Sequence, residues 1–352
     1  MKGRRCRRQC AEIRNPEATC WIPSEAGVVR PPCRLLFLGV MCFRSSLRAC
    51  AVACLLLSPL HAEPPAAPSG NAVIRAPFES SEIVITTTAR VAGAIHSLTW
   101  KGREFIDSHD HGRQLQSASN LDLGTPITNE TYNPTEAGSE RDGTGPGSSS
   151  RLLHLLAVGR ELQTTTQMAF WLPPDGRSGA HPAKNATVLS DHLLTKRVRI
   201  GCRDLPNVIS YDVTFGLPIG ERHTLAVFEA LTGYLPADFS RFLQFNAERG
   251  DLEPLDDTAG EIPRPIVFSL PEGTHAMGIF APPQPAPQRT GPTFGRFRFP
   301  ADRVVKWNCV FRLRDPAGLT PGEQTFRMYV LIGDLATVAA GMRALHADPG
   351  LR

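Results

Sequence analysis

Polar and titratable side chains are concentrated in residues 107–120, which read DSHDHGRQLQSASN and include one large apolar residue, Leu115. If the segment is extended, the histidines and the arginine lie on one face of a strand and the glutamines on the other. Buried polar groups need hydrogen-bond partners, and each one left unpaired costs about 1–3 kcal/mol. We therefore predict that this segment lines a binding site. Its candidate substrate-binding and catalytic residues are His109, His111, Arg113, Gln114 and Gln116.

A second polar segment, residues 132–151, reads YNPTEAGSERDGTGPGSSSR and has the turn signals of a loop. Loops longer than about fifteen residues are usually functional or disordered. We predict that its first half faces residues 107–120 across one concave site. His111 or Arg113 should lie in hydrogen-bonding reach of Glu136 or Asn133, or across a cleft small enough for one sugar ring. The candidate residues of the loop are Tyr132, Asn133, Glu136, Arg141 and Asp142.

A saccharide is the ligand class that this mixture of side chains fits best. Amides, carboxylates and guanidinium groups match sugar hydroxyls, and the apolar faces of sugars lie on aromatic rings. Arg113 or Arg141 could pair with a carboxylate if the partner is a uronic-acid-containing glycan. The aromatic residues available as platforms are Trp100, Trp171, Tyr132, Tyr211, Tyr234 and Trp307.

Catalysis on such a ligand would need a general acid or base near it. His111 and Glu136 are catalytic candidates because they lie in the crowded polar segments. Glu229 is a third, because FEALTGYLP places it on an otherwise apolar strand face where burial would raise its pKa. The alternative for Glu229 is a buried carboxylate held by an arginine. The sequence contains no nucleophile elbow, zinc-protease, phosphate-loop or dinucleotide motif in a credible context, so enzymatic activity stays open.

Metal binding has little support from spacing. His109 and His111, two apart on a strand, could chelate an ion, but no third ligand stands at a recognisable distance in the sequence. Cys202 and Cys309 are 107 residues apart, which gives no paired-cysteine zinc site. They could form a disulfide or remain two buried thiols. We predict neither a metal nor a cofactor.

The elements that would position these residues are β-strands. Eleven or more short β-rich runs with turn signals and no long helices between them predict an antiparallel sandwich or barrel. Lys101-Gly102 predicts a tight hairpin across residues 93–107. In residues 304–314, apolar and polar side chains alternate, with Trp307 on the core face and Lys306 on the polar face. A short helix is expected after Asp334.

The N-terminus reads as a leader. Residues 1–40 are predicted to be a disordered or non-native extension, residues 41–62 a signal peptide and residues 63–79 a linker to one β-sandwich domain at 80–347. Ten of the 38 Lys and Arg residues lie before residue 63, and the remainder carries more acidic than basic side chains. A nucleic-acid partner is therefore excluded, as is a stable membrane span after cleavage. We expect a periplasmic or extracellular protein.

The segments GAIHSLTWKGREFIDSHDHGRQLQSA, YNPTEAGS, FEALTGYLPADFSRF and VVKWNCVFR together resemble a family of exported bacterial proteins of unassigned function, over most of residues 80–346. The opening hairpin is also similar to the start of the galactose mutarotase-like supersandwich, a large antiparallel fold of sugar epimerases and of domains of carbohydrate lyases and hydrolases. The resemblance implies an all-β supersandwich with a short C-terminal helix. Thr135-Glu136-Ala137 follows Asn133-Pro134 without the arginine of the epimerases' Asn-Pro-x-x-Gly-Arg segment, so no catalytic residue is carried over.

Two functions follow from these observations. One is an exported carbohydrate-active protein that binds a saccharide and processes it by the acid–base chemistry of an epimerase, lyase or hydrolase. The other is a non-catalytic carbohydrate-binding or cell-envelope module, which needs aromatic platforms and amides but no acid–base pair.

Overall fold

The computed structural model describes residues 68–128 and 130–351. The predicted extension and signal peptide lie outside these residues. The described chain forms 21 strands and one α-helix, with short 3-10 helices at η1 (Ala89–Val91), η2 (Glu140–Asp142) and η3 (Pro349–Leu351). None of its helices has the length and apolar character needed to cross a bilayer.

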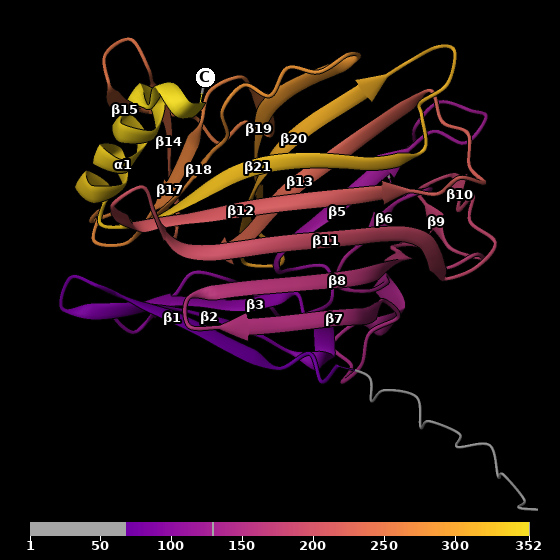
Figure 1. Ribbon diagram of the computed structural model, residues 1–352, viewed down its shortest axis with the longest axis horizontal. Helices are drawn as coiled ribbons and strands as arrows, with labels where there is room; N and C mark the ends of the chain where they lie inside the picture. The colour runs from indigo at the N-terminus through magenta and orange to yellow at the C-terminus, as the bar shows by residue number, and fades with distance from the viewer. Residues whose placement is uncertain (1–67, 129, 352) are drawn as a thin grey trace, which may run out of the picture. The chain divides into compact units, whose positions relative to one another are not determined.

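Nineteen of the strands belong to one continuous antiparallel sheet that folds into two layers (Figure 1). The first layer has the order β1–β2–β3–β5–β13–β20–β19–β16, with the short β4 beside β3. These strands are β1 (Ala72–Phe78), β2 (Ser81–Thr87), β3 (Ile95–Trp100), β4 (Arg103–Glu104), β5 (Leu115–Leu121), β13 (Leu225–Pro236), β16 (Gly260–Ile262), β19 (Arg289–Phe299) and β20 (Val304–Arg314).

The second layer has the order β7–β8–β11–β12–β21–β18–β17–β14–β15. The short strand β6 (Pro134–Thr135) pairs with both β5 and β8 and so joins the two layers. A separate ribbon contains β9 (Arg177–Ser178) and β10 (His181–Pro182). The strands of the second layer are β7 (Arg151–Val158), β8 (Glu161–Phe170), β11 (Leu189–Cys202), β12 (Leu205–Leu217), β14 (Arg241–Asn246), β15 (Asp251–Pro254), β17 (Ile266–Ser269), β18 (Ala276–Phe280) and β21 (Gly322–Gly333).

The main hydrophobic core lies between the two layers. Phe215 on β12 contacts Phe228 on β13, with ring centroids 4.8 Å apart. Phe311 on β20 stacks on Phe326 of β21 at 4.6 Å. Since β12 and β21 belong to the second layer and β13 and β20 to the first, these contacts hold the layers face to face. The predicted all-β antiparallel sandwich is confirmed.

The C-terminal helix covers the outer face of the second layer. Helix α1 (Leu335–Ala347) packs against β21, β18 and β12 over a smaller hydrophobic cluster. Its N-cap is Asp334, whose Oδ1 accepts a hydrogen bond from the backbone N–H of Thr337 at 2.8 Å. Val338 and Met342, one turn apart, are fully buried. Both the predicted cap and the predicted helix are confirmed.

Two predictions about the first strands have different outcomes. The hairpin between β3 and β4 turns at Lys101 and Gly102, both with positive φ, as expected. The linker predicted for 63–79 is corrected, because β1 lies within it and pairs with β2 from Ala72 to Phe78. Alternate residues of β1 are buried, but the Pro/Ala run before it hides this short pattern in the sequence.

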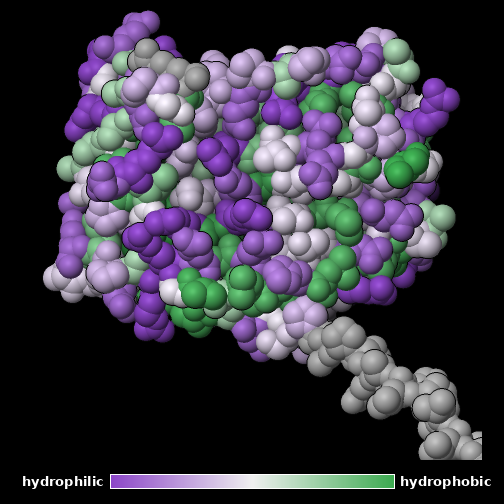
Figure 2. All heavy atoms as spheres, in the orientation of Figure 1, coloured by the Kyte–Doolittle hydropathy of each residue, from purple (hydrophilic) through white to green (hydrophobic). Residues whose placement is uncertain are grey.

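Hydrophobic side chains also reach the surface at the edge of the second layer. The edge strand β7 exposes Leu153, Leu156 and Val158, and hydrophobic residues gather in the lower half of Figure 2, where β7 and β8 run. Cys202 and Cys309 are both free thiols, so the disulfide alternative is not realised.

Candidate functional site

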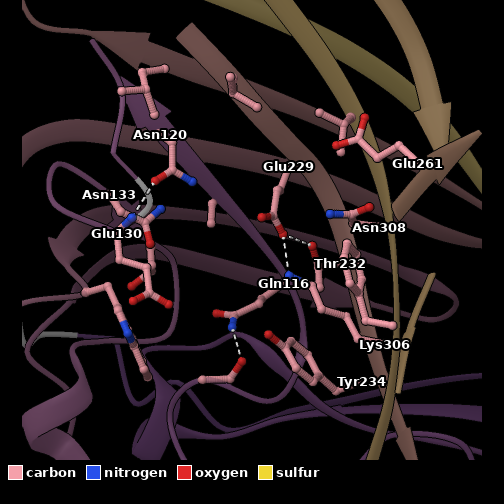
Figure 3. A pocket seen from close by; sticks show the side chains of 18 of the residues that line it. Gln116, Asn120, Glu130, Asn133, Glu229, Thr232, Tyr234, Glu261, Lys306 and Asn308 are labelled. Carbon is pink, nitrogen blue, oxygen red and sulfur yellow. Dashed lines mark hydrogen bonds and ion pairs between the residues drawn. The ribbon is translucent and has the colours of Figure 1, made fainter. Parts of the chain in front are cut away.

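A cleft of about 510 Å³ lies on the first layer, on the side away from the main core. Its floor is built from three neighbouring strands, β5, β13 and β20 (Figure 3). Because side chains alternate along a strand, each of them sends one set into the core and the other set into the cleft. On β20, Trp307 is buried in the core, whereas Lys306 and Asn308 line the cleft. The polar face predicted for residues 304–314 is thus the floor of this cleft.

A β-bulge in β13 changes which residues face the cleft. The pairing register with β20 shifts between Glu229 and Leu231, and the register with β5 shifts between Glu229 and Thr232. Ala230 and Leu231 are both fully buried. One inserted residue reverses the alternation, so Glu229 and Thr232, three positions apart, both line the cleft. Regular alternation would have placed them on opposite faces.

Glu229, Lys306 and Tyr234 form one polar group in the cleft. The Lys306 ammonium lies 2.9 Å from Glu229 Oε2, and the hydroxyl of Thr232 donates to the same oxygen at 2.8 Å. Burial by itself would raise the pKa of Glu229, but the Lys306 charge and the hydrogen bonds outweigh it and lower that pKa. The expected rise is therefore wrong, and the cation that holds the carboxylate is a lysine, not the arginine of the alternative interpretation.

Tyr234 lies beside this pair. Its ring centroid is 5.4 Å from Lys306 Nζ. Burial, the largest effect, raises the pKa of its hydroxyl. The phenol is therefore a hydrogen-bond donor and acceptor at neutral pH.

A second ion pair lies further along β20. Arg312 donates to Glu261 Oε1 at 2.8 Å, and the hydroxyl of Thr293 donates to Oε2 at 2.5 Å. Burial would raise the pKa of Glu261, but these two partners lower it. Each of the two cations that line the cleft therefore already has a carboxylate partner.

Amides and aromatic rings complete the lining. Gln116 and Asn120 project from β5, Asn133 comes from the loop before β6, and Asn308 from β20. Aromatic walls are formed by Trp171, Tyr234, Phe297 and Phe299.

Three of the residues predicted as catalytic or substrate-binding line this cleft, namely Gln116, Asn133 and Glu229. Asn133 Nδ2 donates to the Ser119 carbonyl at 2.5 Å, and Gln116 Nε2 donates to the Gly112 carbonyl at 2.9 Å. Asn133, and Gln116 through its Oε1, which accepts the backbone N–H of Ala137 at 3.3 Å, therefore join the two polar segments.

His111 does not take part in the cleft. Residues 107–114 form a turn-rich loop rather than the extended strand on which the two-face prediction rested, and β5 starts only at Leu115. The His111 ring is fully buried, with Nδ1 at 2.7 Å from the Gly143 carbonyl and Nε2 at 2.6 Å from the Arg90 carbonyl. Both ring nitrogens are used to join backbone segments.

The other residues of this loop also bond locally. Arg113 pairs with Asp110 and Asp302, each at 3.1 Å. Gln114 is buried and its amide donates to the Ser108 hydroxyl. His109 is exposed. The predicted contact of His111 or Arg113 with Glu136 or Asn133 is absent, because these side chains have the partners just named.

Glu136 forms a buried ion pair with Lys196 of β11, and both side chains are fully inaccessible to solvent. Its second oxygen accepts the backbone N–H of Ser117 at 3.2 Å. The Glu136 side chain therefore does not reach the cleft, as the catalytic role predicted for it would require. Charge and hydrogen bonds instead tie the loop after β6 to both layers.

The last loop candidates are spread over other places. Arg141 is exposed and pairs with Asp175. Asp142 accepts the backbone N–H groups of Ser139 and Ser149, each at 2.8 Å, and so closes the loop on itself. Neither side chain lines the cleft.

Tyr132 belongs to a different polar group. Its ring packs on Phe170 and on His223, and burial together with a hydrogen bond to Glu221 raises the pKa of its hydroxyl. Among the described residues, His192, Glu221 and His223 form the group whose ligand-type atoms could hold a metal ion, all lying within 4.8 Å of one another. This site is not predicted from the sequence, because His192 is about thirty positions from Glu221 and His223.

Of the predicted aromatic platforms, Trp171 and Tyr234 line the cleft. Trp100, Tyr211 and Trp307 are buried in the core. The polar and aromatic cleft residues that the site prediction missed are Asn120, Glu130, Thr135, Thr232, Glu261, Phe297, Phe299, Lys306, Asn308 and Arg312. Lys306, Asn308 and Arg312 could have been found from the sequence, because they belong to the polar face predicted for residues 304–314.

No family model matches the chain, and neither does any curated protein. Solved structures with related folds include an α-galactosidase from Lactobacillus brevis, at 8% identity and a TM-score of 0.41, covering 77% of this chain and 40% of that one. A candidate aldose 1-epimerase from Klebsiella pneumoniae has 13% identity and a TM-score of 0.41, covering 80% of this chain and 92% of that one. A heparan sulfate lyase mutant from Pedobacter heparinus has 9% identity and a TM-score of 0.36, covering 76% and 35%.

The chain spans about two fifths of the length of the α-galactosidase. At these TM-scores the similarity says nothing about the chemistry of the cleft.

Proposed function

We propose that this protein binds a neutral saccharide in the cleft formed by β5, β13 and β20. The observation that carries the proposal is the lining itself, in which amides, carboxylates and hydroxyls face the same space as aromatic rings. Sugar hydroxyls both donate and accept hydrogen bonds, and their ring faces pack on aromatic side chains. A volume of about 510 Å³ falls within the range of small-molecule sites.

The charge of the cleft favours a neutral sugar over a uronic acid. Lys306 is paired with Glu229, and Arg312 with Glu261. Glu130 adds a further carboxylate to the lining. A uronate would have to displace one of the paired carboxylates. Arg113 and Arg141, the cations expected to receive a uronate, are paired elsewhere.

Saccharide processing is a second candidate, favoured by the grouping of Glu229, Lys306 and Tyr234. The lowered pKa of Glu229 keeps its carboxylate ionised at neutral pH, and the raised pKa of Tyr234 keeps its phenol protonated, so a proton acceptor and a proton donor lie in the same cleft. Glu229 would then be the general base. A binding module would use the same residues only to orient hydroxyls.

Export belongs to the same proposal. The arginines before the apolar run at residues 49–60 have the layout of a signal peptide. Cleavage near Ala62 would leave strand β1, which begins at Ala72, intact. N-terminal sequencing of the secreted protein should find a start between about residues 62 and 72, and recovery of residues 1–40 from the cytosol would contradict it.

The binding proposal is tested by screening the full chain against a glycan array that holds neutral and uronate-containing oligosaccharides. Calorimetry on the best ligand then compares wild type with Asn308→Ala and Trp171→Ala. Both variants should bind at least about fivefold more weakly, since one hydrogen bond or ring contact contributes about 1 kcal/mol or more.

Arg141→Ala is the control, because Arg141 is an exposed polar residue that pairs with Asp175 and does not line the cleft. It should bind like wild type. Equal binding by all four proteins would place the sugar elsewhere and refute the proposal. Incubation of the bound sugar followed by NMR decides between module and enzyme, since only an enzyme alters the sugar in a way that Glu229→Gln abolishes.

A further inference from the structure

The strongest feature outside the cleft is the cluster of His192, Glu221 and His223. Nε2 of His192 and Nε2 of His223 each lie 2.8 Å from the same Glu221 oxygen, Oε2. Both histidines are almost fully buried, and the Glu221 side chain is 17% exposed. The three residues come from β11 and from the connection between β12 and β13. We propose that this cluster is a zinc-type divalent metal site with two histidine nitrogens and one carboxylate oxygen as ligands.

The orientation of His223 is the first argument. Its Nδ1 faces the backbone carbonyl of Asp122 and can only donate there. A neutral imidazole with its proton on Nδ1 has a lone pair on Nε2. That lone pair points at a carboxylate oxygen, which is also an acceptor. Either Nε2 carries a second proton and the imidazolium donates to Glu221, or a cation lies between the two atoms. A divalent metal fits the two buried histidines that converge on one carboxylate.

The support around the ligands is the second argument. Histidines that bind metals usually donate their other ring nitrogen to a carbonyl or carboxylate, which fixes the ring. Asp122 does this for His223, and its carboxylate also accepts the backbone N–H groups of Thr224 and Leu225, each at 2.9 Å. Asp122 therefore holds both the ring of His223 and the backbone directly after it. Tyr132 supports the third ligand through its hydrogen bond to Glu221.

The dimensions of the cluster suit a tetrahedral ion after a small adjustment. Zinc–nitrogen bonds of about 2.0–2.1 Å place neighbouring ligand atoms about 3.3 Å apart. The distances from His192 Nε2 and His223 Nε2 to Glu221 Oε2, each 2.8 Å, would increase by roughly half an ångström, which side-chain rotation can supply. His223 also lines a cavity of about 570 Å³ together with Asp122 and Thr224. Two histidines and one glutamate leave the fourth position free for a water molecule from that cavity.

The experiment loads the full chain with Zn²⁺ after chelator treatment, removes excess metal, and measures zinc by mass spectrometry. Wild type should hold one equivalent more than His192→Gln or His223→Gln. Glutamine keeps an N–H donor toward Glu221 but lacks the imidazole lone pair. The comparison between variants also subtracts zinc held by the seven cysteines before residue 63.

Affinity and stability give independent readouts. Competition with a chelating dye should show binding weakened by more than about 100-fold in either variant, because even the loss of an outer partner costs about 10–100-fold. Thermal unfolding of wild type should move to higher temperature with added Zn²⁺, and that of the variants should not. His111→Gln is the control, because His111 is an equally buried histidine between two backbone carbonyls.

Three results would overturn the site. The first is a zinc content that is the same in wild type and in both variants. The second is a zinc-induced rise in unfolding temperature that is the same in wild type and in both variants. The third is that wild type binds no zinc beyond the amount held by the cysteines. In the last case the cluster is only a protonated His–Glu–His hydrogen-bond group. If the variants fail to fold, titration of chelator-treated wild type with Co²⁺ decides, since a His₂Glu site gives tetrahedral cobalt bands without thiolate charge-transfer absorption. The proposal does not depend on saccharide binding in the cleft.

Discussion

The Lys306 ammonium lies 2.9 Å from Glu229 Oε2, and this ion pair joins β20 and β13 at the floor of the cleft. The two side chains are 14% and 21% exposed, so the pair is largely removed from water. Removing one partner of such a pair leaves a charge without compensation, whereas removing both does not. The pair is therefore expected to contribute both to stability and to the shape of the site.

Lys306→Met should lower the free energy of unfolding by about 2 kcal/mol, somewhat less than the 3–5 kcal/mol typical of a fully buried pair. The Glu229→Gln/Lys306→Met double variant should recover part of this loss. Urea denaturation of the two single variants and the double variant measures the coupling. Equal, additive losses would show that the ion pair does not stabilise the fold.

The same pair predicts a pH dependence with a definite sign. The pKa of Glu229 is lowered in the folded protein from its ordinary value of 4.5. The stabilisation from this group is therefore fully present above about pH 4.5 and is lost as the pH falls through the lower folded value. The stability difference between wild type and the double variant should be constant from pH 7 to pH 5 and shrink below pH 4.5. A difference that grows on acidification contradicts this assignment.

Lys196 and Glu136 form a second pair, with both side chains fully buried between the layers. Lys196→Met alone should cost about 3–5 kcal/mol, and Glu136→Gln added to it should cost little more. Lys101→Met is the matched control, because Lys101 pairs with Glu79 at 2.6 Å on the surface and should contribute less than about 1 kcal/mol. Chemical denaturation of the three variants tests this ranking.

Gly295 on β19 supports the cleft by leaving room for Asn308. Its backbone N–H donates to Asn308 Oδ1 at 2.9 Å, and a Cβ at this position would overlap that oxygen. Gly295→Ala should therefore rotate the Asn308 amide and weaken saccharide binding by about fivefold, which corresponds to the roughly 1 kcal/mol of one hydrogen bond. Gly147→Ala, where a Cβ would contact nothing, should bind like wild type. Calorimetry on the array ligand measures both, and unchanged binding by Gly295→Ala would contradict a role for Asn308.

Much of the fold follows from local patterns. The turn at Lys101 and Gly102, the cap at Asp334 and the alternation along β20 all rest on interactions within a few residues, so the sequence alone predicts them. Strand β11 did not appear among the predicted strands. His192 and Lys196 occupy its buried face, so its hydrophobic alternation is broken in the sequence although its burial alternates in the structure.

The site depended on contacts between distant segments. Nothing local to Glu229 reveals the bulge that turns Glu229 and Thr232 to the same side, because the bulge is defined by the pairing with β20 and β5. His111 looked available for chemistry, but two carbonyls from distant segments occupy its ring nitrogens.

The sequence by itself determined that the chain forms an antiparallel β-sandwich, since strand periodicity and turn residues act over short distances. It also marked the polar face of residues 304–314 and placed Glu229 on an apolar strand. Only the tertiary structure decided that these two features form one cleft and that Glu136 is used for a buried ion pair. The reason is physical: the partner of a charged or polar side chain is set by which strands become neighbours, and that depends on packing of the whole sandwich.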